Sequence, residues 1–353
     1  MTDRSPSTPR LASTATAFPP NVVGPDDAVR ALVRMFPAEP PQVVDALVRR
    51  SGVERRRFAL PLERLLEPRD FDARQRDYAV AALALAADAS RAALDRAGLR
   101  SADVDAVIDV SCTGVVLPAL DVPLAAALGL HPNVHCVPTT EAGCAAGALA
   151  LGVAGDFAAR GARTLVVAVE TCSLSLGPGD RGREHLVAGV LFGDGAAAAV
   201  VAPDGAGPPI LGAGSHLFPG TSQVMGFDVG AAGLRLVLRR ELPEILAAAF
   251  PDAALAFLAA RGRSVDDVRL HLAHPGGRRV LETYAAAFGE PPPDLRWSWE
   301  ALRRYGNLSS AGVLSVLDLA AEAEAWPSDG VSLLTAFGPG LSAEFVLFGP
   351  PES

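Results

Sequence analysis

Three polar residues near the ends of predicted core elements could together support nucleophilic catalysis. Cys144 follows Gly143 and precedes a run of Ala, Gly and Leu, so its thiol is predicted at the start of a buried helix. Unpaired N–H groups and the helix dipole favour a thiolate there. His274 ends the apolar stretch VRLHLAH, and Asn307 precedes the small-residue segment LSSAG. A cysteine, a histidine and an asparagine could serve, in that order, as a nucleophile, an acid–base group and an amide donor.

Each of the three residues also has an interpretation without catalysis. Cys144 could be a small core cysteine, His274 a hydrogen-bonded structural residue and Asn307 a helix N-cap. Papain-like proteases use the same residue order, but their C-G-S-C-W signature is missing and Cys144 lies in the middle of the chain. The other histidines are interpreted as structural or surface residues: His131, His135, His185, His216 and His271.

The composition excludes several kinds of chemistry. The 353 residues include 31 basic side chains, all of them arginine, and the formal net charge is −9. Without lysine the chain has no Schiff-base nucleophile, no pyridoxal-phosphate anchor and no Walker-A phosphate loop. The negative charge argues against non-specific binding to nucleic acid or to an anionic membrane.

The cysteines and the apolar segments indicate a cytoplasmic location. The four cysteines contain no C-x-x-C pair and are too few for a disulfide framework in a chain of this length. The N-terminus lacks the apolar core of a signal peptide, and no uninterrupted apolar run is long enough for membrane insertion. No group of Cys, His or acidic residues has metal-ligand spacing, so no metal site is expected.

The remaining motifs permit more than one interpretation. FGDG (192–195) and FGPG (337–340) lack the spacing of a phosphate loop and are predicted to be tight turns between strands. The run VRRSGVERRR (48–57) is the densest basic cluster. It is either a solvated surface or a rim that binds the phosphates of coenzyme A.

The pattern of apolar residues predicts an α/β fold. Helical spacing occurs over 24–35, 40–50 and 72–98, the last of these ending at a glycine suited to a C-cap. A buried strand is predicted at 104–112 and further strands at 135–140 and 164–173, alternating with helices, so that the strands are mostly buried.

Internal similarity suggests a duplication. FGDGAAAAVVAP (192–203) resembles FGPGLSAEFVLFGP (337–350), and AGCAAGALAL (142–151) resembles YGNLSSAGVLSVL (305–317). If the halves are related by a pseudo-twofold axis, Cys144 and Asn307 occupy equivalent helix starts and can face one shared cavity.

The motifs together resemble the chalcone synthase-like type III polyketide synthases of the thiolase superfamily. They are DARQ (72–75), GCAAG (143–147), LFGDGAAA (191–198), AHPGG (273–277), YGNLSSAGVL (305–314) and FGPG (337–340). The resemblance implies a five-layered αβαβα fold of two duplicated halves, 1–203 with the nucleophilic cysteine and 204–353 with the histidine and asparagine. It also implies a homodimer.

The resemblance assigns a role to each of the three polar residues. Cys144 would take the starter acyl group from an acyl-CoA, and His274 would keep its thiolate ionised. His274 and Asn307 would hold the thioester carbonyl of malonyl-CoA during decarboxylation, without a metal or redox cofactor. Repeated condensation and cyclisation would give an alkylpyrone, resorcinol or naphthol. In having cysteines at pocket positions, Cys112 and Cys172, the chain resembles bacterial members of the family that make naphthols or pyrones.

Further positions match the family's substrate pocket. Phe192 matches a gatekeeping aromatic, whereas Leu236 stands where the second gate aromatic is expected. Phe227 replaces a glycine of the plant enzymes, and Leu117 matches a residue that reaches into the neighbouring subunit's cavity. The other implied pocket residues are Cys112, Thr113, Cys172, Ser175 and Ser309.

The coenzyme A site is less completely matched. Arg50 matches one of the family's basic phosphate-binding residues, and Arg55 or Arg56 could substitute for the others. Gly276 and Gly277 are expected to shape a turn that lets a ligand approach the backbone.

Two other functions remain open within this fold. A ketoacyl synthase III-like enzyme would perform one condensation onto acyl carrier protein, but GNLSSAG and the segment around FGPG favour the polyketide family. A non-catalytic scaffold is the other alternative. Retention of Cys144, His274 and Asn307 argues against it.

Overall fold

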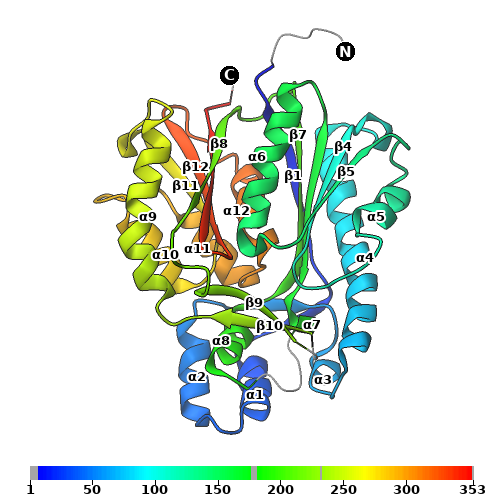
Figure 1. Ribbon diagram of the computed structural model, residues 1–353, viewed down its shortest axis with the longest axis vertical. Coiled ribbons are helices and arrows are strands. Elements are labelled where there is room, and N and C mark those ends of the chain that lie inside the picture. The colour runs from blue at the N-terminus through cyan, green and yellow to red at the C-terminus, as the bar shows by residue number, and fades with distance from the viewer. Residues whose placement is uncertain (1–6, 176–180, 231–232, 352–353) are drawn as a thin grey trace.

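Two β-sheets face each other across a pair of central helices (Figure 1). The structure, a computed structural model, describes residues 7–175, 181–230 and 233–351. The first sheet has the strand order β1 (Arg10–Ala17), β7 (Asp194–Ala202), β6 (Thr164–Thr171), β4 (Ala106–Val110) and β5 (His135–Thr139). The second has the order β11 (Val268–Ala273), β12 (Val331–Gly338), β13 (Ser342–Phe348) and β8 (Ile210–Leu217).

Helices complete a five-layered αβαβα arrangement. α6 (Ala146–Ala159) and α12 (Ser310–Glu322) pack together between the sheets, whereas α4 (Phe71–Ala97) covers the first sheet and α9 (Leu242–Ala259) the second (Figure 1). The buried strands are almost entirely apolar, as expected for sheets covered on both faces. The predicted fold class is confirmed.

The two halves repeat one order of elements. β1, α4, β4, α6, β6 and β7 in the first half correspond to β8, α9, β11, α12, β12 and β13 in the second. α6 and α12 are therefore equivalent helices, and Cys144 and Asn307 lie just before them. This is the arrangement that the internal similarity predicts.

Small residues allow the two central helices to approach closely. A Cβ atom added to Gly147 of α6 would lie 2.4 Å from the carbonyl oxygen of Ser310 in α12. Only glycine leaves room for that backbone contact. The Ala- and Gly-rich composition of α6 therefore sets the distance between the two halves and between the residues at the helix starts.

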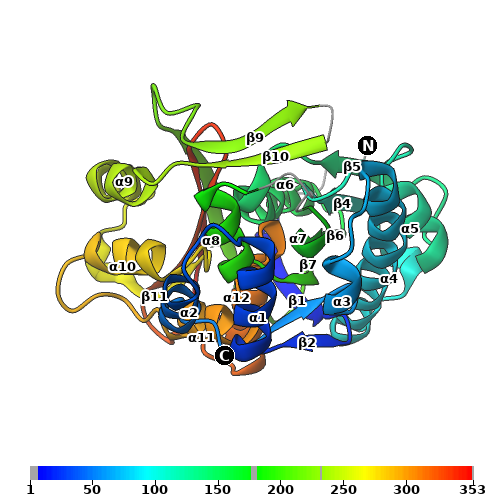
Figure 2. The same cartoon turned by 90° about the horizontal axis from the view of Figure 1, so that it is seen from below.

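A smaller group of elements lies at one end of the molecule, at the bottom of Figure 1 and facing the viewer in Figure 2. It comprises α1 (Pro25–Met35), α2 (Pro41–Arg50), α3 (Leu62–Leu65), α8 (Arg183–Leu191), the pair β2 (Asn21–Val23) and β3 (Arg56–Phe58), and the hairpin β9 (Met225–Gly230) with β10 (Gly233–Leu238). The helices predicted at 24–35, 40–50 and 72–98 correspond to α1, α2 and α4, and the last ends at Gly98 in the left-handed conformation.

Shorter helices connect the strands at the edges of the layers. They are α5 (Asp121–Leu128), α7 (Cys172–Ser175), α10 (Arg278–Ala286) and α11 (Arg296–Tyr305). Among the described residues, α9 is the one helix long and apolar enough to cross a membrane, and 39% of that stretch is buried. Leu246, Phe250 and Leu258 of α9 belong to the core cluster beside the second sheet. The apolar residues of α9 therefore pack into the protein core, although the helix belongs to the outer layer.

Candidate active site

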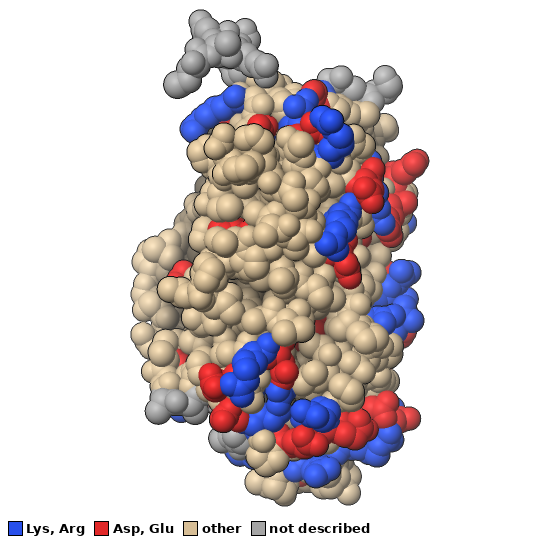
Figure 3. Space-filling view, turned by 90° about the vertical axis from the view of Figure 1, so that its right-hand side faces the viewer, with Lys and Arg blue, Asp and Glu red and all other residues tan. Residues whose placement is uncertain are grey.

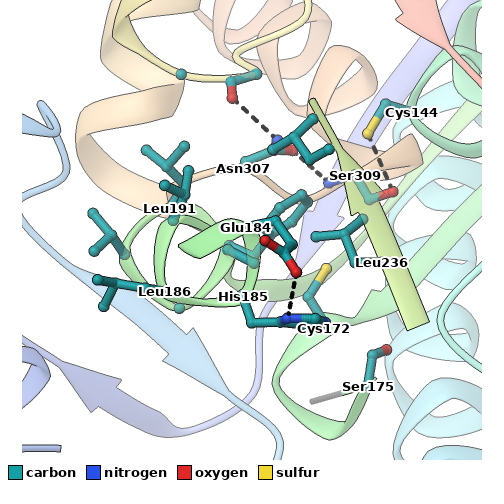
Figure 4. Close-up of a pocket in the computed structure, with 18 of the residues that line it drawn as sticks. Cys144, Cys172, Ser175, Glu184, His185, Leu186, Leu191, Leu236, Asn307 and Ser309 are labelled. Carbon is teal, nitrogen blue, oxygen red and sulfur yellow. Dashed lines mark hydrogen bonds and ion pairs between the residues drawn. The ribbon is translucent and has the colours of Figure 1, made fainter. Parts of the chain in front are cut away.

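The three predicted catalytic residues line one cavity of about 1380 Å³. Cys144 lies in the short turn Gly143–Ala145 that leads into α6, and Asn307 precedes α12 (Figure 4). His274 follows the last residue of β11. The cavity lies between the starts of the central helices and the smaller group of elements. The structure thus brings together residues that are 130 and 163 positions from Cys144 in the sequence.

Cys144 is held in its turn by close backbone packing. Gly143 has φ +52°, and a Cβ atom there would lie 2.6 Å from Pro339 in the FGPG turn. The Cys144 Sγ atom lies 3.5 Å from Ser309 Oγ. Burial raises the pKa of the Cys144 thiol to about 12. Burial therefore opposes the thiolate expected from a helix start, and the helix dipole alone does not offset the lost solvation.

His274 presents an imidazole without a partner in the part of the chain that the structure describes. Both ring nitrogens are buried and make no hydrogen bond there. Burial lowers the pKa of His274 to about 3, so the ring is neutral. A Cβ atom on Gly312 of α12 would lie 2.9 Å from the ring, and one on Gly276 would lie 3.3 Å from it. These glycines make room for the ring and leave its nitrogens available to a substrate.

The Asn307 side chain is fixed by two hydrogen bonds. Its Nδ2 donates to the carbonyl oxygen of Gly276 at 3.3 Å, and its Oδ1 accepts from the backbone N–H of Ser309 at 2.8 Å. The Asn307 backbone N–H donates to the carbonyl of Leu191, and its own carbonyl accepts from the N–H of Gly193. The second hydrogen of Nδ2 remains available as an amide donor.

Ser309 lies between two cysteine thiols. Its Oγ is 3.3 Å from Cys112 Sγ and 3.5 Å from Cys144 Sγ. Ser309 has φ +49°, a conformation rare for residues other than glycine. A strained residue in contact with a nucleophile is typical of a functional site.

Glu170, which contacts the cavity residues Cys112 and Thr113, is a residue that the sequence interpretation missed. This fully buried carboxylate in β6 accepts hydrogen bonds from Thr113 Oγ1 at 2.7 Å, Ser310 Oγ at 2.5 Å and the Cys112 N–H at 3.1 Å. Burial raises its pKa. Its only sequence signal was an acidic residue in the otherwise apolar strand TLVVAVET. It holds Cys112 and the start of α12 in position.

The predicted pocket residues take different places. Phe192, Phe227 and Leu236 line the cavity, as do Cys112, Thr113, Cys172, Ser175 and Ser309. Leu117 is 92% exposed and does not line the cavity of its own chain. An exposed leucine is compatible with insertion into a second subunit.

Glu184 and His185 of α8 are additional cavity residues. The imidazole of His185, interpreted from the sequence as structural or surface, is buried in the cavity wall (Figure 4). Its Nδ1 lies 3.3 Å from Glu184 Oε1.

The predicted coenzyme A-binding arginines do not form one rim. Arg50 is exposed and lines the cavity, whereas Arg55 is exposed outside it. Arg56 is buried, and its NH1 donates to the carbonyls of Gly189 at 2.6 Å and Phe192 at 2.9 Å. Arg56 also lines the cavity, but its guanidinium is engaged with these backbone carbonyls, so a role for Arg56 in binding phosphate remains a prediction.

Other arginines surround the cavity instead. Arg50, Arg183, Arg239 and Arg279 are exposed cavity residues, and within the described chain none has a carboxylate within ion-pair distance. Three more are paired: Arg235 with Asp228, Arg240 with Glu241 and Arg278 with Glu282. The unpaired group comes from three helices, α2, α8 and α10, and from the loop between β10 and α9, which explains why no single basic run identified it.

The two glycines after His274 also line the cavity. Gly277 has φ +140°, which favours glycine, and a Cβ atom there would lie 3.1 Å from Leu191. Backbone can therefore approach a ligand at this turn, as expected. A role in binding coenzyme A remains a prediction.

The FGDG and FGPG motifs differ in structure. FGPG joins β12 to β13 as a tight turn, as predicted. FGDG instead joins α8 to β7, and Phe192 forms an isolated parallel bridge with Asn307. The prediction of a turn between strands is wrong for FGDG, because the residues before it form a helix. Among the described residues, no group of His, Cys, Asp and Glu could hold a metal ion.

A cysteine, a histidine and an asparagine on one cavity of a duplicated αβαβα fold define a thiolase-like acyltransferase. Sequence models of the chalcone and stilbene synthases match the chain over residues 10–208 for the N-terminal domain and 210–349 for the C-terminal domain. The chain belongs to the chalcone and stilbene synthase family, the type III polyketide synthases.

Known proteins resemble this chain over nearly its whole length. A 1,3,6,8-tetrahydroxynaphthalene synthase of Streptomyces peucetius subsp. caesius is 37% identical over 351 residues, which cover 96% of this chain and 92% of that protein. The crystal structure of the 1,3,6,8-tetrahydroxynaphthalene synthase of Streptomyces coelicolor A3(2) has a TM-score of 0.93 and 31% identity, covering 98% of this chain and 100% of that one. The alpha-pyrone synthesis polyketide synthase-like Pks18 of Mycobacterium tuberculosis is 29% identical over 352 residues, covering 95% and 89%.

Proposed function

We propose that this enzyme adds malonyl-CoA units repeatedly, by decarboxylative condensation, to an acyl group carried on Cys144. The observation that carries the proposal is the convergence of Cys144, His274 and Asn307 on one cavity, with both imidazole nitrogens unpartnered in the described chain. A thiol, a neutral base and an oriented amide meet the needs of acyl transfer and of carbonyl activation.

Loading begins when the Cys144 sulfur attacks the thioester carbonyl of an acyl-CoA. The thiol proton passes to His274, which the cavity holds as the neutral imidazole. The carbon–sulfur bond to coenzyme A then breaks, and the departing thiolate takes up a proton. An isolated charge is poorly solvated here, but transfer of the proton creates a thiolate and an imidazolium together, and their mutual attraction is strong in a site of low polarity.

Extension needs two hydrogen-bond donors on the carbonyl of malonyl-CoA. The carbon–carbon bond to the carboxylate breaks and carbon dioxide leaves. The electron pair of the broken bond stays on the thioester and forms an enolate. His274 and the free Nδ2 hydrogen of Asn307 stabilise the enolate oxygen, and each such donor is typically worth about 3–4 kcal/mol. The enolate carbon attacks the Cys144 thioester and releases the thiolate, which can accept the lengthened chain again.

The unpaired arginines are the proposed binding site for the phosphates of coenzyme A. Arg50, Arg183, Arg239 and Arg279 surround the cavity of a protein whose net charge is −9. Arginine makes charge-assisted, bidentate hydrogen bonds to phosphate. This assignment keeps the predicted role of Arg50 and does not include Arg56, whose guanidinium is hydrogen-bonded to backbone carbonyls.

A naphthol-type product made from malonyl units alone is the best supported outcome. The relatives at 37% and 31% identity are 1,3,6,8-tetrahydroxynaphthalene synthases. The second thiol, Cys112, lies within hydrogen-bond distance of the same Ser309 hydroxyl as Cys144. Both thiols are therefore placed to contact a growing polyketide.

An alkylpyrone or resorcinol made from a longer acyl starter is a second candidate. Apolar side chains of α1, α3 and α8 line the cavity and would accommodate an alkyl chain: Leu32, Met35, Leu62, Leu65 and Leu186. Pks18, at 29% identity, is described as an α-pyrone synthesis enzyme.

Intact-mass analysis with a panel of acyl-CoAs, alone and then with malonyl-CoA, tests the proposal when the released products are identified by mass spectrometry. We expect an adduct on Cys144 and multiply extended products, and Cys144→Ala should abolish both while remaining folded. Phenolic products from malonyl-CoA alone support the naphthol pathway, whereas pyrones that require a fatty starter support the second candidate. A single extension would favour a ketoacyl synthase-like reaction, and the absence of any adduct or product would reject the proposal in favour of a scaffold.

We also propose that the chain forms a homodimer through the side that carries β5 and α5. β5 is the outer strand of the first sheet and leaves backbone groups unpaired on one side in the described structure. Figure 3 shows that the central part of this side carries few charged residues. Leu117 is exposed in the segment between β4 and α5.

A further inference from the structure

Arg56 lines the cavity, but its guanidinium is hydrogen-bonded to backbone carbonyls of the cavity wall. The side chain comes from β3 and is 3% exposed. Its NH1 donates to the carbonyls of Gly189 and Phe192, at the end of α8. The last carbonyls of a helix have no partner within the helix, so an outside donor is needed when they are buried. Arg56 supplies that donor.

The segment held by Arg56 is joined directly to Asn307. The Asn307 N–H donates to the carbonyl of Leu191 at 2.8 Å, and the Gly193 N–H donates to the carbonyl of Asn307 at 3.0 Å. The Arg56 stem also packs beneath Gly306, where an added Cβ atom would lie 3.1 Å from Arg56 Cγ. The backbone positions of the Phe192 gate and of the Asn307 amide are therefore set together.

A buried carboxylate balances the charge of Arg56. Asp194, the next residue after Gly193, interacts electrostatically with the guanidinium and partly offsets the cost of burying it. Asp194 accepts hydrogen bonds from the N–H of Ser173 at 2.8 Å and from the N–H of Ala59 at 2.7 Å. Burial lowers the pKa of Arg56 to about 10, so Arg56 is still charged at neutral pH.

We propose that Arg56 is a positioning residue for the condensation reaction. It fixes the backbone bridge between Phe192 and Asn307, the pair of hydrogen bonds that joins residues 191–193 to Asn307, and this bridge orients the Asn307 amide and the Phe192 ring. This inference rests on the proposed decarboxylative function. The Arg56 guanidinium is hydrogen-bonded to the backbone carbonyls of Gly189 and Phe192, so its removal should affect the rate of carbonyl activation and leave coenzyme A binding intact.

Loss of the guanidinium would disturb the bridge in two ways. The carbonyls of Gly189 and Phe192 would be buried without a donor, and Asp194 would lose its balancing charge. The bridge can relieve this only by moving, and a displacement of about 1 Å at a catalytic group can lower a rate by about 100-fold.

The test compares Arg56→Met and Arg56→Lys with Arg57→Met. Arg57 is the neighbouring residue in β3, and its NH1 also donates to a backbone carbonyl, that of Pro19, but outside the cavity. For each variant we would measure kcat and KM for malonyl-CoA decarboxylation, the Kd of coenzyme A by calorimetry, and thermal unfolding. Rates would be expressed per Cys144 thiol that forms an acyl adduct with an acyl-CoA, identified by peptide mapping, so that unfolded protein does not enter the comparison.

We expect Arg56→Met to lower kcat per acylated site by about 10- to 100-fold, with the Kd of coenzyme A within twofold of the parent. Arg56→Lys, which keeps the charge and one donor, should recover part of the rate and carries the test if the methionine variant does not fold. Arg57→Met should keep the parental kcat. An unchanged kcat per site, or a weakened Kd with unchanged kcat, would overturn the inference. Absence of decarboxylation in the parent enzyme would instead reject the proposed function.

Discussion

Phe227 and Leu236 are directly paired across the two strands of the β9–β10 hairpin, and both line the active-site cavity. Side chains at directly opposed positions of an antiparallel pair lie on the same face, with Cβ atoms about 5 Å apart. The two side chains therefore form one apolar wall of the cavity, and a change in either alters the same space.

Substitutions in this wall should change the length of the product. Phe227→Gly is expected to enlarge the cavity and shift products towards additional malonyl units, whereas Leu236→Phe should reduce the space and favour earlier release. The measurement is the distribution of products by liquid chromatography and mass spectrometry with a fixed starter. Val229→Ala is the control, because Val229 lies on the same hairpin but is 84% exposed and outside the cavity. Identical product profiles for all variants would contradict the assignment.

The sequence was sufficient to predict the framework of the site. Cys144 and Asn307 each precede a helix made of small residues, and the duplication places those helices as equivalents in the core. His274 follows a buried strand and is succeeded by glycines, so its place at a cavity edge was also predictable. Such features depend on local spacing and on helix and strand periodicity, which a single sequence records.

Contacts between distant segments could not be predicted in the same way. Arg56 belongs to a basic run, which favours a surface role, yet it turns inward because the end of α8 offers carbonyls and Asp194 offers a balancing charge. Glu170 binds Cys112 and Ser310, which are 58 and 140 residues away. Likewise, the pKa of Cys144 depends on burial by the assembled cavity, whereas the sequence shows only a helix start.

His274 should control the reactivity of the Cys144 thiol. Burial, with a smaller contribution from the charge of Glu170, raises the pKa of this thiol to about 12, so little thiolate is present at pH 7 unless a neighbouring group accepts the proton. His274→Gln keeps a side chain of similar size but cannot accept the proton. We expect Cys144 of this variant, followed by peptide mapping, to react with iodoacetamide at least about tenfold more slowly at pH 7. Its rate should keep rising throughout the range from about pH 7 to about pH 10, because that range lies below the thiol pKa of about 12.

Asn307→Ala serves as the comparison for this experiment, since an amide cannot take the proton of a thiol. It should lose decarboxylation but keep the parental rate of alkylation. Equal alkylation rates for the His274→Gln variant and the parent across the pH range would show that the imidazole does not ionise the thiol.

Asp109 is expected to make stability depend on pH. Burial in β4 raises its pKa to about 7, with a further contribution from the nearby charge of Asp121. An aspartate in the unfolded chain titrates near pH 4, so the folded state binds the extra proton and stability falls as pH rises from about 4 to 7. Asp109→Asn removes this loss, and its melting temperature at pH 8 should exceed that of the parent by on the order of 5 °C.

Melting curves between pH 5 and pH 8 would check this expectation. Asp156→Asn is the control, because Asp156 is exposed and the change should leave the pH dependence as it is in the parent. If the parent and the Asp109→Asn variant lose stability in parallel as the pH rises, Asp109 is not the group responsible.

Leu117 should determine the oligomeric state. Leu117 is 92% exposed and lies between α5 and β4, the strand that pairs with the edge strand β5. Burying a leucine typically stabilises an interface by about 2 kcal/mol, whereas a buried arginine without a partner would oppose association. Light scattering should give the parent a mass twice that of the 36.4 kDa chain, and Leu117→Arg should shift the population towards monomer.

The matched control for this prediction is Leu255→Arg. Leu255 is also exposed, but it lies on α9, at the opposite side of the molecule from β5 (Figure 1). This variant should remain a dimer, because the same charge is introduced away from the proposed interface. If both variants dissociate, general destabilisation is the cause, and if the parent is itself a monomer, the proposed dimer does not form. Dissociation by Leu117→Arg alone, together with an altered product distribution, would show that the partner subunit completes the cavity.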